Sequence, residues 1–150
     1  MNNTEQIIKE TLEKILSIIG VTADIQISKD IENMFVIDLN GEDLGVIIGF
    51  HGDGLLSLQT VTSLIVSKQA GEYTHLKIDI NDYRKQREQK IYDLIKNTID
   101  RVRFSGKAIE LSPMNPAERR LVHTEVSKYS DGVSESVGEG HSRRPVIRLK

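Results

Sequence analysis

Hydrophobic and polar positions along the first half of the chain follow two periods, and these periods predict its helices and strands. Apolar residues three to four apart indicate helices that bury one face, and alternating apolar residues indicate strands. The predicted elements are, in order, a helix over 4–19, strands over 24–28 and 34–39, helices over 42–48 and 53–68, and a strand over 75–80. The sequence therefore predicts an α+β domain over residues 1–81, with the element order α-β-β-α-α-β.

The pattern changes after residue 81, where a long charged segment predicts a connecting helix over 82–104. Its Arg84, Lys85, Arg87 and Lys90 are expected on a solvated face. Asn115, Pro116 and Glu118 then stand at the cap, first-turn and capping-box positions of a second helix that reaches about residue 129. Strands are predicted over 108–111, 133–137 and 144–149. Residues 82–150 are thus expected to form the connecting helix and a small α/β domain.

Composition narrows the class of protein. The 150 residues carry a net charge of −2 and no cysteine, so disulfides, thiolate chemistry and cysteine zinc sites are excluded. Charge is unevenly divided, because residues 1–81 hold 5 Lys or Arg against 12 Asp or Glu, and residues 82–150 hold 15 against 10. No apolar run is as long as a membrane span, and the first residues do not form a signal peptide. A cytoplasmic protein with an acidic front half and a basic back half is expected.

The stretch Gly49-Phe50-His51-Gly52 lies between the two predicted helices of the first domain. A glycine turn that leads into a helix N-terminus directs backbone N–H groups and a positive dipole at an anion. A lone G-x-x-G is most often an ordinary turn, and the spacing here is neither that of a dinucleotide fold nor that of a nucleotide P-loop. Beside a three-stranded sheet, however, G-x-x-G between two helices is the nucleic-acid clamp of a KH domain.

A second candidate site lies on the helix that begins at Asn115. Arg119 and His123 are four residues apart and therefore share a face, and Arg143, Arg144 and Arg148 follow on the closing strand pair. Guanidinium groups bind phosphate with two parallel hydrogen bonds, and a histidine ring can donate or stack. The alternative is an ordinary exposed arginine beside a histidine that is satisfied in the local core.

Taken together, these residues resemble a known family. The front half resembles a type II KH domain, and the back half resembles the small domain named for its Arg-x-x-x-His signature. Fused in this order, they resemble the Jag family, also called SpoIIIJ-associated proteins, KhpB or EloR, over essentially the whole chain. The most specific parts are the stretch Met114–His123 and the closing Ser142-Arg143-Arg144-Pro145-Val146-Ile147.

The resemblance implies a bacterial, cytoplasmic, non-catalytic protein that binds single-stranded RNA, with single-stranded DNA as an alternative ligand. It also implies a post-transcriptional regulator linked to cell elongation and division, a single-domain KH protein as partner, no membrane insertion and no cofactor. The residues expected to contact RNA are Gly49, Phe50, His51, Gly52, Arg119, His123, Arg143 and Arg144.

Two departures from the family leave alternatives open. The family clamp usually holds basic residues between its glycines, whereas Phe50 and His51 stand here and could stack on a base or a partner surface. The competing function is therefore a protein-interaction scaffold whose KH half has lost RNA affinity. Members often carry a further N-terminal domain, whose role we expect to be absent.

An enzyme is the third alternative, but the four histidines lack metal-ligand spacing and no nucleophile–base pair is apparent.

Overall fold

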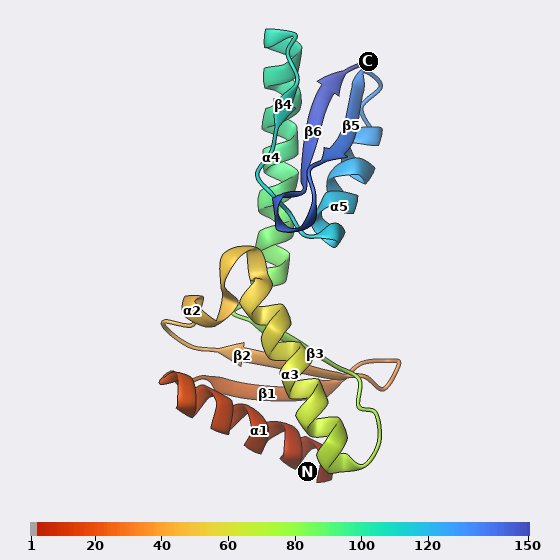
Figure 1. The fold of residues 1–150 in the computed structure, drawn as a ribbon. Coiled ribbons are helices and arrows are strands. Elements are labelled where there is room, and N and C mark those ends of the chain that lie inside the picture. The colour runs from red at the N-terminus through yellow and green to blue at the C-terminus, as the bar shows by residue number, and fades with distance from the viewer. Residues whose placement is uncertain (1–2) are drawn as a thin grey trace. The chain divides into compact units, whose positions relative to one another are not determined.

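The computed structural model describes residues 3–150, and the chain folds into two compact units that are divided between Arg84 and Lys85. Figure 1 shows the course of the chain through both units. The first contains α1 (Asn3–Ile19), β1 (Asp24–Lys29), β2 (Phe35–Asn40), α2 (Gly45–Ile48), the 3-10 turn η1 (Phe50–Gly52), α3 (Asp53–Ala70) and β3 (Leu76–Ile80). This is the predicted α-β-β-α-α-β order, which confirms the α+β fold class.

The sheet of the first unit has the strand order β1-β2-β3, so β3 is an edge strand. β1 and β2 are antiparallel, while β2 and β3 are parallel, with Ile37 opposite Ile78. Alternate residues of β2 and β3 are buried, and α1 and α3 pack against each other and supply the rest of one apolar core. Figure 1 shows α3 crossing the sheet beside α1. The opposite face carries polar residues such as Asp38 and Lys77.

The second unit has its own core. Its elements are α4 (Tyr83–Ser105, whose first two residues belong to the first unit), β4 (Ile109–Glu110), α5 (Pro116–Ser127), β5 (Gly132–Val137), the 3-10 turn η2 (Gly140–Ser142) and β6 (Arg144–Leu149). The sheet has the order β4-β6-β5 and is antiparallel throughout. Ile95 and Ile99 of α4, Val122 and Val126 of α5, and Ile147 of β6 are buried together. One helix face from each of α4 and α5 therefore closes one apolar core with the sheet.

Two predicted elements are shorter than expected. The helix expected from residue 42 begins only at Gly45, because Asp43 has a left-handed φ of 56° that a right-handed helix excludes. The strand expected over 108–111 contains only Ile109 and Glu110.

The start of α5 agrees with the sequence in one respect and differs in another. The Asn115 side chain accepts a hydrogen bond from the Glu118 N–H at 2.9 Å, and Pro116 begins the helix, as predicted. Glu118 does not complete a capping box. Its carboxylate instead accepts a hydrogen bond from Arg87 Nε of α4 at 2.8 Å, in a pair with both side chains largely buried. The expectation that Arg87 is solvated was therefore wrong.

Candidate nucleic-acid interface

The glycine turn of the first unit is built from unusual backbone angles. α2 ends at Ile48 with Gly49 as its cap, η1 follows, and α3 begins at Asp53 with Gly52 as its cap. Gly49 and Gly52 have φ values of 70° and 84°, which residues with a side chain rarely adopt. His51 also has a left-handed φ, of 50°. The turn therefore delivers the chain to the α3 N-terminus in a conformation that few other sequences allow.

Packing within the unit also requires these glycines. A Cβ on Gly49 would lie 2.8 Å from Gly54 N, and one on Gly52 would lie 3.0 Å from Tyr83 Cε1. A Cβ on Gly54 would overlap the carbonyl oxygen of Ile47 and lie 2.9 Å from that of Ile48. The G-x-x-G spacing indicates Gly49 and Gly52 and does not single out Gly54. Gly49 and Gly54 are needed so that the end of α2 can lie against the start of α3, and Gly52 is needed where the turn packs against Tyr83.

The tip of the turn is aromatic. The rings of Phe50 and His51 stack with centroids 3.8 Å apart at 22°, and the Phe50 side chain is 67% exposed. An exposed ring next to a helix N-terminus can stack on a nucleobase, an interaction worth about 1–3 kcal/mol per base. The turn thus offers backbone N–H groups and an aromatic surface, with no Lys or Arg between Gly49 and Gly52.

The second predicted pair lies on α5, with support from β5. His123 is partly buried, with Nδ1 2.6 Å from Ser134 Oγ and Nε2 2.8 Å from Ser136 Oγ. In a neutral ring one nitrogen donates a hydrogen bond and the other accepts one, so one serine hydroxyl is the acceptor and the other is the donor. Neither serine belongs to the motifs that the sequence shows. Their alternation on β5 could have indicated a shared face, but not that the face meets α5.

Arg119 and Arg143 act on the same histidine. Burial, followed by the positive charges of Arg119 and Arg143, lowers the pKa of His123 below its usual 6.5. Arg119 Nε donates to the Met114 carbonyl at 3.2 Å, and Arg143 Nη1 donates to the Gly138 carbonyl at 2.9 Å. Within residues 3–150, neither guanidinium forms an ion pair with a carboxylate. Both charges therefore act on a neutral histidine, and neither is balanced by a carboxylate in this part of the chain.

Arg144 and Arg148 differ from this pair, because each is matched with an acid. Arg144 Nε donates to Glu110 at 2.8 Å, and Arg148 Nε donates to Glu135 at 3.0 Å. Of the arginines on the closing hairpin, the structure therefore brings Arg143 to the Arg119–His123 position with its charge uncompensated, while Arg144 is held by Glu110.

The lowered pKa of His123 predicts a pH dependence of stability. The unfolded chain takes up a proton near pH 6.5, whereas the folded chain does so only at lower pH. The unfolded state thus binds more protons in this interval, and the free energy of unfolding should fall as the pH drops below about 6.5. Urea titrations above and below that pH measure the effect, and His123→Gln should weaken it.

The exposed His141 provides the matched control, because His141→Gln removes a histidine from the same unit without touching the two serines. A stability difference that is as large in His123→Gln as in the control would show that another group is responsible.

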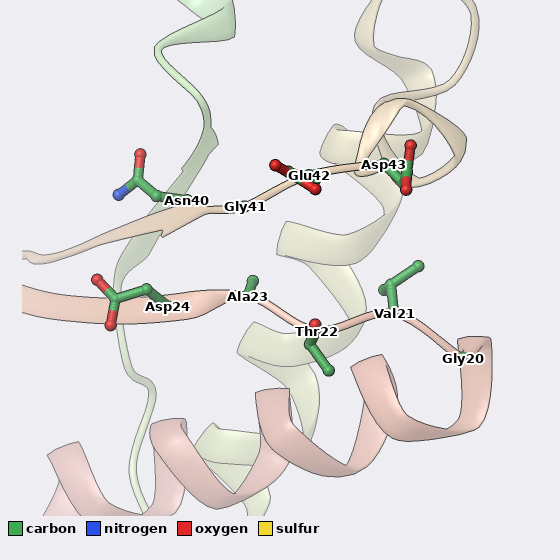
Figure 2. Close-up of a pocket in the computed structure, with 9 residues that line it drawn as sticks. All are labelled: Gly20, Val21, Thr22, Ala23, Asp24, Asn40, Gly41, Glu42 and Asp43. Carbon is green, nitrogen blue, oxygen red and sulfur yellow. The ribbon is translucent and has the colours of Figure 1, made fainter.

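A hollow in the first unit can be set aside as a phosphate site. It lies between the turn before β1 and the turn after β2, and Figure 2 shows the residues of these two turns, with Asp24 and Asn40 on the neighbouring strands at its edge. Its lining includes Asp24, Glu42 and Asp43 and no Lys or Arg, so its field repels phosphate. Among the described residues, no group of His, Asp and Glu is arranged to hold a metal ion, and no helix is long and apolar enough to cross a membrane.

Family comparisons divide the chain as its geometry does. Residues 5–78 match the family model described as "KhpA/KhpB, KH domain", and residues 89–149 match the model of the R-three-H domain, which is the Arg-x-x-x-His domain. The first match covers the glycine turn and most of the sheet of the first unit. The second covers Arg119, His123 and Arg143.

Curated relatives match across both domains. The chain is 34% identical over 142 residues, 94% of its length, to an RNA-binding protein KhpB of Clostridium symbiosum. It is 32% identical over 114 residues, 75% of its length, to that of Bacillus subtilis, and 24% identical over 145 residues, 95% of its length, to that of Streptococcus pneumoniae. It spans 64%, 55% and 44% of these relatives' own lengths. Since both domains are matched in the same order, the chain belongs to the family of KH and Arg-x-x-x-His domain proteins that these KhpB relatives represent.

Proposed function

We propose that this protein binds single-stranded RNA and catalyses no reaction. The observation that carries the proposal is the pair of guanidinium groups, Arg119 and Arg143, that lie near a neutral His123 without a carboxylate partner among residues 3–150. Phosphate contacts supply most of the affinity of such proteins, and arginine binds phosphate with two parallel hydrogen bonds. Relatives that are named RNA-binding proteins, and the paired KH and Arg-x-x-x-His domains, support the same function.

In this proposal the glycine turn makes the second contact with the strand. The backbone N–H groups at the α3 N-terminus face a phosphate, and the exposed Phe50 ring stacks on a base. The acidic surface of the first unit works against a tight grip. The KH half therefore orients the strand and stacks on one base, whereas most of the binding free energy comes from Arg119 and Arg143. Single-stranded DNA is a weaker candidate ligand that shares the phosphates and bases.

A scaffold role is the second candidate function, and one observation favours it. Leu56, Val61 and Leu64 stand on the outer side of α3 with exposed fractions of 52%, 47% and 64%. Apolar side chains grouped on one helix are typical of a protein-interaction surface. A single-domain KH protein is the partner that the family resemblance implies. A cytoplasmic, post-transcriptional role in cell elongation or division completes the proposal and rests on that resemblance alone.

The test of the RNA proposal is a salt series with matched arginine variants. Each phosphate neutralised on a single strand contributes about −0.7 to the slope of log affinity against log salt. Arg119→Ala and Arg143→Ala should each lower that slope and weaken binding by roughly tenfold or more, since a hydrogen bond to a charged group contributes about 1.5–3 kcal/mol. Fluorescence anisotropy with a labelled short RNA measures both quantities.

Arg148→Ala is the matched control, because it removes an arginine of the same unit whose charge Glu135 already balances. It should change the slope little. Equal effects of all three substitutions would mean that only net charge matters, and an absence of binding to any single strand at low salt would overturn the proposal.

A further inference from the structure

Side chains form hydrogen bonds with the backbone of one residue at the edge of the KH sheet. β3 is an edge strand, so alternate residues along it direct their backbone N–H and C=O groups away from β2. At Ile78 these groups are taken up within the chain. The Ile78 N–H donates to Gln59 Oε1 of α3 at 3.0 Å, and the Ile78 carbonyl accepts from Arg84 Nε at 3.2 Å and Arg84 Nη2 at 3.1 Å.

Gln59 and Arg84 are also joined directly. Arg84 Nη2 donates to Gln59 Oε1 at 3.0 Å, so that oxygen receives two hydrogen bonds. This arrangement fixes the orientation of the amide, because the reverse orientation would place the NH₂ group against two donors. The sequence placed Arg84 on a solvated face, and this expectation was wrong. Arg84 is instead part of a hydrogen-bonded network with Gln59 at the sheet edge.

The donors and acceptors of this network determine what it offers to a ligand. Both acceptors, Gln59 Oε1 and the Ile78 carbonyl, already receive two hydrogen bonds each. No residue among 3–150 accepts a hydrogen bond from Gln59 Nε2 or Arg84 Nη1, and the Arg84 guanidinium has no carboxylate partner there. These two side chains therefore present N–H donors and no free acceptor, and the nearby Asp79 carboxylate is turned to the backbone N–H groups of Ile80 and Arg84.

We propose that Gln59 and Arg84 form a base-reading position of the KH half that selects guanine over adenine. This inference rests on the proposed RNA function. Guanine presents two adjacent acceptors, O6 and N7, on one edge, whereas adenine presents the N6 amino donor beside N7. Adenine would therefore direct a donor at a surface made only of donors, and guanine satisfies that surface at two points.

The place of Gln59 on α3 supports this role. It lies seven residues beyond Gly52 on a helix that begins at Asp53, which corresponds to about 10 Å along the axis at about 1.5 Å per residue. A KH clamp holds about four nucleotides by their backbone, so a strand gripped at the turn and lying along α3 passes this position within that stretch. The glycine turn then fixes the backbone, and the Gln59–Arg84 pair reads one base.

The sharpest test replaces only the free donor of Gln59. Gln59→Glu keeps an oxygen that accepts from the Ile78 N–H and Arg84, and it exchanges the outward NH₂ for an acceptor beside the remaining Arg84 donors. A mixed donor and acceptor surface fits adenine. Gln69→Glu is the matched control, because it makes the same change of charge at an exposed position of the same helix.

The experiment measures the affinity of the full chain for short RNA strands in which guanine, hypoxanthine or adenine is placed in turn at each position. The wild type should prefer guanine over adenine at one position by roughly five- to a hundredfold, the range expected of one bidentate base contact. Hypoxanthine should equal guanine, since it keeps O6 and N7. Gln59→Glu should abolish or reverse this preference, and Gln69→Glu should keep it. Circular dichroism melting should give the same transition for both variants.

Three results would overturn the inference. The first is RNA binding with no preference for guanine over adenine at any position. The second is a preference for guanine that is as large in Gln59→Glu as in Gln69→Glu. Either of these two results leaves the proposed RNA function intact and means that the network only satisfies the backbone groups at the edge of the sheet. The third is an absence of binding by the wild type to every strand at low salt, which removes the RNA function and the inference together.

Discussion

Replacing Gly54 by alanine should destabilise the first unit by about 3 kcal/mol, the upper end of the range for overpacking. The new Cβ would overlap the Ile47 carbonyl oxygen and approach that of Ile48, and both obstacles are backbone atoms that no side-chain rotation can move away. For a domain of this size, each kcal/mol lowers the melting temperature by about 4–8 °C. A decrease of roughly 12–24 °C in the transition of the first unit is therefore expected in scanning calorimetry of the full chain.

Gly45→Ala is the matched control for this experiment. Gly45 begins α2, and a Cβ added there would meet no atom within 4 Å. Alanine is a better helix former than glycine, so this variant should melt at the wild-type temperature or slightly above it. If the two variants melt within a few degrees of each other, the close approach of α2 to α3 does not determine the stability of the clamp.

Arg87→Ala should destabilise the second unit by about 3–5 kcal/mol, because it leaves a buried carboxylate without its cation. The Glu118 side chain is 10% exposed and Arg87 is 20% exposed. Glu118 Oε2 is also buried without a hydrogen-bond partner among the described residues, so no other group shares the charge. Adding Glu118→Gln to Arg87→Ala removes the charge and should restore part of the loss. Urea denaturation of the single and double variants measures both effects.

The control for this pair is Arg103→Ala on the same helix. Arg103 holds Asp131 with two hydrogen bonds of 2.8 and 2.9 Å, but both side chains are more than 40% exposed. Exposed pairs contribute about 0–1 kcal/mol, so the loss should be several times smaller than in Arg87→Ala. Equal losses would mean that burial does not set the strength of the Arg87–Glu118 pair.

The contrast between these two ion pairs shows which parts of the fold the sequence could predict. The period of apolar residues placed α1, α3, α4 and the paired strands within one to three residues of their positions, because burial of one face imposes that period on the sequence. The period of apolar residues does not show which charged residues form ion pairs with each other. Arg84 and Arg87 have the same local pattern as Lys85 and Lys90, yet tertiary contacts partly bury the two arginines and leave the two lysines exposed.

The candidate site shows the same limit. Gly49 and Gly52 could be predicted because the G-x-x-G spacing is visible in the sequence between two predicted helices. Arg119 and His123 could be predicted because residues four apart lie on the same face of a helix. Gly54 could not be assigned a role, since only the approach of α2 shows that a Cβ has no room there. Ser134 and Ser136 lie on a different strand, and their contact with His123 depends on how β5 packs on α5. That the eight predicted residues touch RNA remains a prediction.

The exposed Phe50 ring also makes the glycine turn open to direct observation. The chain contains no tryptophan, so Phe50→Trp would give a protein whose only indole stands at the tip of the turn, next to His51. Excited at a wavelength that the four tyrosines do not absorb, this indole would report on that one surface. A strand that stacks on the turn and a partner that covers α3 would then be distinguishable by fluorescence in a single cuvette.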